Sequence, residues 1–515
     1  LKRLAKEKKR NQEKLVAKSH PERRQFPLTD GQKSIWALDK LLPGNKAYNN
    51  PLAITCYIEH EFDADKVEYT LRKMTQQHDI FRTTIQLVDG QPQQCIGDKV
   101  LFNFKFDDIS QLPEQEKQQW VLTTARQEGL QEFSLEHGPL FSWRMSKTHA
   151  NEYIIMLTFH HIISDGWTVS LCFKEFMSLY FGQPSTPAAH FKDYSLEENQ
   201  KLNEGYYDES IEFWQNKLKG TEGKLDLTTD FPRPAYPSFQ GSYVHNTLTA
   251  KDNHKLIEFA AKHGTTPFHV ILTAYQILLH KYSGQNDIII GIPFANRNDT
   301  KTQTMMGLFM NTLPLRFQLD SNQSLQMILA KTKSEAEQAA QHQNIALNRI
   351  LENIDYDRDP SINPLYQVAL TYQVYPHSRT NQLFSYSPLK VDYGVAKLDL
   401  NLWVEEDGDE LLFTLNFDSQ LFKPQTARRI IDDLHITLTT LIEQSESKLI
   451  DVSLIKSEQR NQLLKTSDVF THQQATPFHQ RFEKVAQNLP HQTAVQCQKR
   501  KLTYQELDKK ATLIA

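Results

Sequence analysis

The most informative stretch of the chain is YIIMLTFHHIISDGW, residues 153–167. Its first seven residues form an apolar run with the length and composition of a buried β-strand. Two histidines end this run, and Asp165-Gly166 then predicts a sharp turn. Apolar residues return at helical spacing after the turn and continue to Tyr180. The sequence therefore predicts a strand, a turn and a helix, with two titratable side chains at the junction.

The two histidines, His160 and His161, are expected to differ in role. Successive side chains of a strand point to opposite faces, so only one ring can enter a given pocket, and a metal site made by both rings is disfavoured. An imidazole with an ordinary pKa of about 6.5 can accept a proton or a hydrogen bond at neutral pH, which suits acyl transfer to an amine or a hydroxyl. By residue type alone, a His-His pair at the end of a strand is more often a buried core pair with satisfied hydrogen bonds, and it is the specific set of His, His, Asp and Gly that favours a functional role.

The composition is that of an ordinary globular protein. The chain has 515 residues, and no apolar run approaches the roughly 18 residues that span a bilayer. A formal net charge of -4 argues against a nucleic-acid partner. The four cysteines show no metal-ligand or redox spacing, which favours free thiols and a cytoplasmic location. Because the chain begins at Leu1 rather than Met, we expect it to be part of a longer protein.

The pattern along the chain predicts five parts. Residues 1–20 are rich in lysine and arginine and predict a basic linker helix. Strand-like and helix-like segments then alternate, which indicates a mixed α/β (α+β) fold with one lobe over residues 21–200 and another over 201–460. A polar linker over 461–475 precedes a new amphipathic segment over 476–515.

Motifs along the chain resemble those of the condensation domains of nonribosomal peptide synthetases. Residues 160–166, HHIISDG, match the family's HHxxxDG motif. The other motifs occur in the family's order, and such colinearity is far more specific than any one short motif. They are PLTDGQKSIW at 27–36, HDIFRT at 78–83, FW at 213–214 with DFPRP at 230–234, MGLFMNTLPLR at 306–316, RDPSINPL at 358–365 and LTYQEL at 502–507. The last of these resembles the first motif of an adenylation domain.

The resemblance implies both a fold and a reaction. The fold is a pair of lobes, each like chloramphenicol acetyltransferase, in a V-shaped pseudo-dimer with a central tunnel. An upstream donor carrier domain and a downstream acceptor carrier domain present thioesters on phosphopantetheine arms, and the acceptor amine attacks the donor carbonyl to form an amide. We therefore expect a monomeric enzyme that binds no cofactor of its own, with an adenylation domain in the same full-length chain.

The same resemblance implies roles for single residues. The catalytic positions are His161, the histidine at the middle of the tunnel, and Gly166, which supplies a sharp turn with close approach of backbone to substrate. His160 is structural. Asp165 is expected to point away from the tunnel and to pair with Arg82 rather than to orient His161. Trp167 is a further structural position of the motif. The candidates for the tunnel or the lobe contact are Gln32, Asn311 and Arg316.

Several positions depart from the family's pattern and leave the subtype open. Gln77 replaces the arginine of RHExLRT, Phe191 and Glu197 replace the tyrosine and tryptophan of YxDYAxW, and residues 342–347 fit only half of HQDxPFE. The central motif is intact.

Two other functions also stay open. One is a coenzyme A-dependent acyltransferase, because the HxxxD pattern of His161 and Asp165 marks that wider superfamily. The other is a non-catalytic domain of the same fold that recruits a carrier or a tailoring enzyme, although such domains typically lose His161 or its neighbours.

Overall fold

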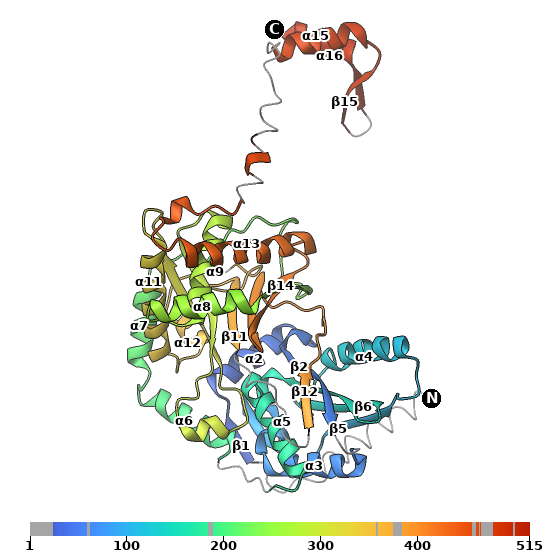
Figure 1. Cartoon of the computed structure of the whole chain (residues 1–515), viewed down its shortest axis with the longest axis vertical. Helices are drawn as coiled ribbons and strands as arrows, with labels where there is room; N and C mark the ends of the chain where they lie inside the picture. The colour runs from blue at the N-terminus through green and yellow to red at the C-terminus, as the bar shows by residue number, and fades with distance from the viewer. Residues whose placement is uncertain are drawn as a thin grey trace. The chain divides into compact units, whose positions relative to one another are not determined.

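The computed structural model describes residues 24–58, 62–183, 189–356, 359–373, 384–455, 460–462, 464, 477–497 and 500–514 (Figure 1). It forms two compact units, one ending at Val452 and the other beginning at Ser453. The basic helix expected over 1–20, Arg358 and most of the linker expected over 461–475 lie outside the described residues. No described helix is long and apolar enough to cross a membrane.

The first sheet of the larger unit has five strands in the order β12-β2-β7-β6-β5. The central strand β7 (Glu152–His160) lies antiparallel to β2 (Asn49–Ile58) and to β6 (Phe141–His149). The edge strands are β5 (Asn103–Asp108) and β12 (Phe384–Pro388). The expected lobe boundary at residue 200 puts β12 in the second lobe, yet this strand completes the first sheet.

Strand β7 is buried almost along its whole length because helices cover both faces of its sheet. Ile155 and its alternate neighbours share a core with α3 (Ala64–Gln77) and α5 (Gly166–Tyr180). Ile154 and Met156 face the opposite way, into a smaller core that includes residues of α4 (Glu114–Gly129). A strand covered on both faces needs apolar residues at every position, so the prediction of a buried strand before the two histidines is confirmed.

A second sheet has six strands in the order β10-β9-β11-β13-β14-β8. Strand β11 lies parallel to β9 and to β13, and the other neighbours are antiparallel. This mixture confirms the α/β (α+β) class. The strands are β10 (Asn311–Gln318), β9 (Asp287–Phe294), β11 (Val368–Gln373), β13 (Leu400–Asp407), β14 (Glu410–Asp418) and β8 (Gly241–Leu248).

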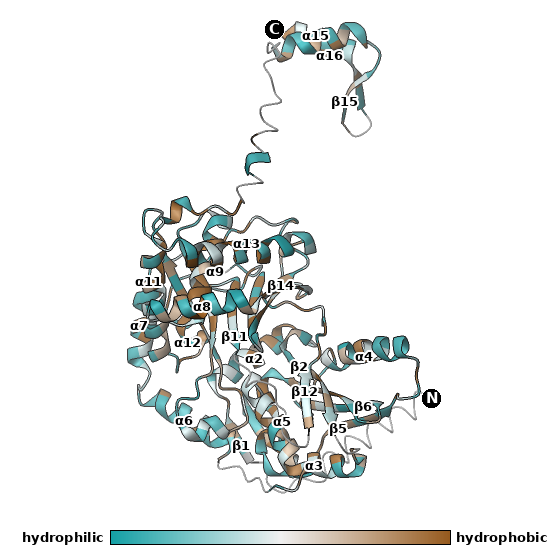
Figure 2. Cartoon of the chain, in the orientation of Figure 1, coloured by the Kyte–Doolittle hydropathy of each residue, from teal (hydrophilic) through white to brown (hydrophobic). Residues whose placement is uncertain are grey.

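We call the larger unit up to residue 200 the first half and the rest of it, to Val452, the second half. Helix α9 (Pro267–Ser283) is the most enclosed helix of the second half. It contacts β9 and the three helices α8 (Ala250–Lys262), α11 (Leu325–Gln341) and α13 (Pro424–Glu443). A helix enclosed in this way must be apolar all round, and every residue from Val270 to Leu279 is buried. Figure 2 shows the contrast between the brown α9 and the mixed teal and brown of α8 and α13.

A small third sheet and several further helices complete the described part of the larger unit. A small sheet contains β1 (Arg24–Pro27), β4 (Gln91–Ile96) and β3 (Thr83–Val88). The other helices among the described residues of the larger unit are α2 (Asp30–Leu41), α6 (Phe191–Asn203), α7 (Asp208–Leu218), α10 (Thr300–Thr304), α12 (Leu347–Glu352) and the 3-10 turns η1 (Lys46–Tyr48), η2 (Asp79–Arg82), η3 (His161–Ile163) and η4 (Leu449–Asp451).

The smaller unit is a hairpin flanked by two helices. Strands β15 (Thr493–Cys497) and β16 (Arg500–Thr503) pair antiparallel between α15 (Phe478–Asn488) and α16 (Tyr504–Ile514). The start of α16 is capped reciprocally, because Thr503 Oγ1 accepts from Glu506 N and the Glu506 carboxylate accepts from Thr503 N. The amphipathic segment predicted over 476–515 thus contains two helices.

Candidate active site

His161 is held in one orientation by the turn that follows it. Its Nδ1 lies 2.8 Å from the backbone oxygen of Ser164. Because a carbonyl oxygen only accepts hydrogen bonds, Nδ1 carries the hydrogen, and Nε2 of the neutral ring keeps its lone pair. His161 is partly open to solvent, whereas Ile162 and Ile163 are fully buried and anchor the turn. The turn therefore fixes the tautomer of the ring and leaves Nε2 as its basic atom.

The surroundings of His161 keep its ring neutral. Burial, followed by the positive charge of Lys397, lowers the pKa of His161 to about 4, and the charge of Asp165 opposes this shift. The ring is therefore uncharged at neutral pH. An uncharged ring at this position can accept a hydrogen bond from an amine.

His160 lies in a different environment from His161. It is 5% exposed, and its Nδ1 accepts a hydrogen bond from Ile162 N at 3.2 Å. Its ring meets Phe133 edge to face, and burial lowers its pKa to about 3. His160 thus caps the turn that carries His161, which fits a structural role.

Asp165 pairs with Arg297, and the expected pair with Arg82 is wrong. Both carboxylate oxygens lie 3.1 Å from Arg297 Nη2, and the two residues are 2% and 6% exposed. The carboxylate also accepts from Thr168 N at 2.7 Å and from Phe309 N at 3.1 Å. In the described structure Asp165 makes no hydrogen bond to His161, so its role is to join the start of α5 to the segments after β9.

Arg82 is satisfied by its own neighbourhood, which explains the failed pairing. Its guanidinium pairs with Asp79 three residues earlier and donates to the backbone oxygens of Thr75 and Gly97. Arg297 follows β9, 132 residues after Asp165 in the chain. No local pattern in the sequence marks it.

A threonine and a glycine extend the connection made by Asp165. Thr168 Oγ1 donates to Gly307 O at 2.7 Å and accepts from Gly307 N at 3.0 Å. A Cβ on Gly307 would collide with the ring of Phe191, so only glycine fits there. Phe191, one of the departures from the family pattern, is 2% exposed and packs edge to face on Phe309. The Phe191 ring is buried in apolar packing, where a tyrosine hydroxyl is not needed.

Gly166 and Trp167 begin α5 at the exposed side of the turn. The φ angle of Gly166 lies outside the left-handed region, and a Cβ there would meet only Gln373 Nε2, at 3.6 Å. The expected turn therefore does not require glycine for its backbone conformation. Trp167 is 47% exposed and donates from Nε1 to Gln303 O at 3.0 Å. Both residues thus face segments from the second half of the chain.

The residues expected at the tunnel or the lobe contact form hydrogen bonds with partners in their own half of the chain. Gln32 is fully buried and donates to Ile162 O at 3.1 Å, so it supports the His161 turn from within the first half. Asn311 donates to Gln343 O, and Arg316 forms a two-point ion pair with Asp287. These contacts stay within the second half, and the motif positions alone did not reveal them.

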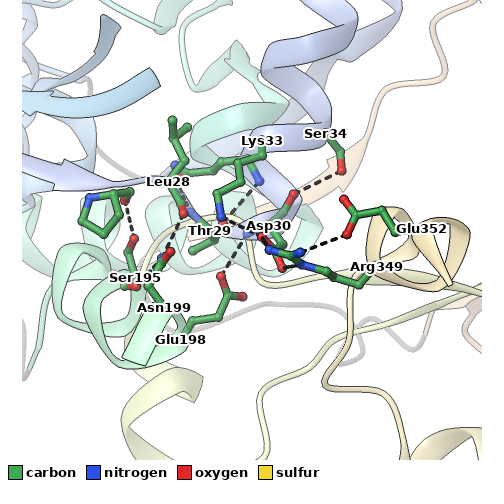
Figure 3. Close-up of polar contacts among 12 residues, drawn as sticks. Leu28, Thr29, Asp30, Lys33, Ser34, Ser195, Glu198, Asn199, Arg349 and Glu352 are labelled. Carbon is green, nitrogen blue, oxygen red and sulfur yellow. Dashed lines mark hydrogen bonds and ion pairs between the residues drawn. The ribbon is translucent and has the colours of Figure 1, made fainter. Parts of the chain in front are cut away.

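A second polar junction between distant segments was missed by the sequence interpretation (Figure 3). Asp30 of α2 accepts from Arg349 Nε of α12 at 2.7 Å and from Lys33 Nζ at 2.8 Å. Its backbone N donates to Glu198 Oε2 of α6 at 3.0 Å. Burial, followed by the charge of Asp30, raises the pKa of Glu198 to about 7. Charged residues in polar helices resemble any solvated face, so no pattern along the chain marks this junction.

Comparison with known proteins gives one family. The condensation-domain family model matches residues 22–464. A linear gramicidin synthase of Brevibacillus parabrevis is 30% identical over 509 residues, which are 96% of this chain and 6% of that protein. Gramicidin S synthase 2 of Aneurinibacillus migulanus is 28% identical over 495 residues, which are 95% of this chain and 11% of that protein. The chain thus spans a small part of the length of these relatives.

Solved structures show the same fold. A four-domain nonribosomal peptide synthetase bound to AMP and glycine superposes with a TM-score of 0.77 at 23% identity, over 95% of this chain and 38% of that one. The X-domain from teicoplanin biosynthesis gives a TM-score of 0.73 at 23% identity, over 85% of this chain and 99% of that one. At this identity the likeness establishes the fold alone.

The Asp165–Arg297 pair gives a prediction about stability. Asp165→Ala and Arg297→Ala should each lower the free energy of unfolding by roughly 3 to 5 kcal/mol, because each strands a buried charge. The double variant should lose less than the two single losses added together. Denaturant unfolding of the four proteins measures this. Glu68→Ala, which removes the exposed pair of Glu68 with Arg72, is the control and should change stability by about 0.5 kcal/mol or less. An Asp165→Ala protein with parental stability but no turnover would show that Asp165 acts on His161 directly.

Glu198 gives a prediction about pH. Because its pKa in the folded chain lies above the ordinary value of 4.5, the folded chain holds the proton more tightly, and this contribution to stability is lost as the pH rises from about 4.5 to about 7. Glu198→Gln should therefore raise the free energy of unfolding by roughly 2 kcal/mol at about pH 8, and by much less near pH 5. The control is Glu197→Gln, since Glu197 is exposed and paired with Lys201. Equal effects of Glu198→Gln at both pH values would contradict the assigned pKa.

Proposed function

The chain belongs to the condensation-domain family of the nonribosomal peptide synthetases, and from this membership we propose that it forms amide bonds. The donor is an acyl or peptidyl thioester, and the acceptor is the amine of an aminoacyl thioester. Both arrive on the phosphopantetheine arms of carrier domains, so the chain needs no cofactor of its own. The observation that carries this proposal is the neutral His161 ring, with Nδ1 bound to Ser164 O and Nε2 available.

The chemistry assigns His161 the positioning of the amine. In the reaction the amine nitrogen bonds to the donor carbonyl carbon, the carbon–sulfur bond breaks, and the proton lost by nitrogen ends on the departing thiol. An α-ammonium has a pKa near 8, so full proton transfer to a ring with a pKa of about 4 is uphill by about 5 kcal/mol. A hydrogen bond from the neutral amine to Nε2 carries no such cost and orients the nitrogen lone pair.

The proposal extends to the partners of the chain. Residues 476–515 begin an adenylation domain, an interpretation supported by the LTYQEL motif and by the compact unit in which it lies. The partners are a donor carrier upstream and an acceptor carrier downstream, and the chain acts as a monomer in the cytoplasm. The four cysteines form no disulfide with one another, which fits a reducing compartment.

Loss of the His161 ring tests the proposed reaction. His161→Ala should lower amide formation by about a hundredfold or more with unfolding unchanged, because one positioned hydrogen-bonding group is lost. His160→Ala should instead lower stability, because it removes the cap of the turn and leaves a cavity. The measurement is mass spectrometry of the product made from loaded native carriers, with thermal unfolding of each variant.

Two results of that assay would contradict the proposal. Full activity of a folded His161→Ala protein would remove the histidine from the reaction. Equal turnover of a coenzyme A thioester in place of the loaded donor carrier would favour the coenzyme A-dependent acyltransferase.

A further inference from the structure

Lys397 lies beside the histidines although no motif contains it. It precedes β13, and its Nζ lies 4.8 Å from the ring centroid of Tyr48 in η1. The residue after Tyr48, Asn49, is the direct β-sheet partner of His160. Lys397 thus precedes a strand of the second sheet, but its ammonium lies near the end of β7 in the first sheet, where the His161 turn begins.

The ammonium of Lys397 has no anionic partner in the described part of the chain. Neither a hydrogen bond nor an ion pair satisfies it there, and the carboxylate two residues on, Asp399, forms a two-point pair with Arg233. The contact with the face of Tyr48 contributes only about 1 kcal/mol. A cation beside the two histidines that no carboxylate neutralises is a candidate for function.

The surroundings of Lys397 combine solvent access with close enclosure. Its side chain is exposed to solvent, yet protein groups around it lower its pKa by desolvation to about 8. Its charge in turn lowers the pKa of both His160 and His161. Since Asn49 lies opposite His160, its neighbour Tyr48 lies at the level of His161, and the ammonium held over the Tyr48 ring is therefore near the His161 turn.

We propose that Lys397 is a further functional residue of the reaction centre, where its ammonium stabilises the negative charge that forms on the donor carbonyl oxygen. This inference rests on the proposed amide-forming function. When the amine attacks, the carbonyl π electrons move to oxygen, and when the thiolate leaves they return to form the amide. Lys397 gives up no proton in either step. Its positive charge also disfavours protonation of His161, which keeps Nε2 available to accept a hydrogen bond from the amine. The same charge lowers the barrier to attack on the carbonyl, because it stabilises the negative charge on oxygen.

Three variants separate charge from structure. Lys397→Met keeps the length of the side chain and removes the charge, and should lower kcat at least tenfold with little change in the KM for loaded carriers. Lys397→Arg keeps the charge and should retain most of the activity. Lys390→Met, which removes an exposed lysine of the same segment, is the control and should behave like the parent chain. Parental kcat in Lys397→Met, or equal loss of kcat in the methionine and arginine variants, would overturn the proposal.

A histidine titration tests the charge without using activity. In Lys397→Met the pKa of His161, followed by NMR of the ring and assigned by the signal missing from His161→Gln, should rise by up to about one unit because a nearby cation is gone. The other groups that act on His161, which are the carboxylate of Asp165 and the backbone oxygen of Ser164, remain in place. An unchanged pKa of His161 would overturn the proposal.

The two measurements also separate the inference from the proposed function. A parent chain that forms no amide with loaded carriers would refute the function. The titration would still show whether the charge of Lys397 acts on His161.

Discussion

The buried contact between Asp165 and Arg297 joins the start of α5, which packs on the first sheet, to the segment that follows β9 of the second sheet. The carboxylate accepts from the guanidinium and from two backbone N–H groups, and the guanidinium also donates to Met305 O and lies 4.1 Å from the Phe309 ring centroid. A buried ion pair adds little stability over apolar packing, but loss of one partner is costly. The pair therefore specifies one arrangement of the turn rather than strengthening the fold in general.

The arrangement of that turn sets the chemistry of the site. Helix α5 begins immediately after Asp165, and the turn before it binds Nδ1 of His161 through Ser164 O. The side-chain amide of Gln32 supports the same turn by donating a hydrogen bond to Ile162 O. The tautomer of His161 thus follows from backbone geometry that the ion pair and a buried amide hold in place, which is how a histidine without a carboxylate partner keeps a fixed orientation.

The sequence predicted the local features of this site and missed the distant ones. The apolar run ending at His160 and the helix after Gly166 follow from residue pattern alone, because hydrophobic periodicity is a local property. The partner of Asp165 could not be predicted, since Arg82 resembles the family motif but already has Asp79 beside it. The place of β12 in the first sheet could not be predicted either, because the sequence of a five-residue strand does not indicate that its partner is β2.

Two cations, the buried Arg297 and the exposed Lys397, show why burial alone does not reveal function. Arg297 donates to backbone oxygens, to a threonine and to a carboxylate, so its charge is neutralised and its position fixed. Lys397 has only an aromatic face beside it in the described structure and remains accessible to solvent. A neutralised cation exerts little field on its surroundings, whereas an unpaired cation acts on any charge that forms nearby. The pairing of each cation, rather than its depth, therefore separates the residue that holds the turn from the residue that faces the reaction.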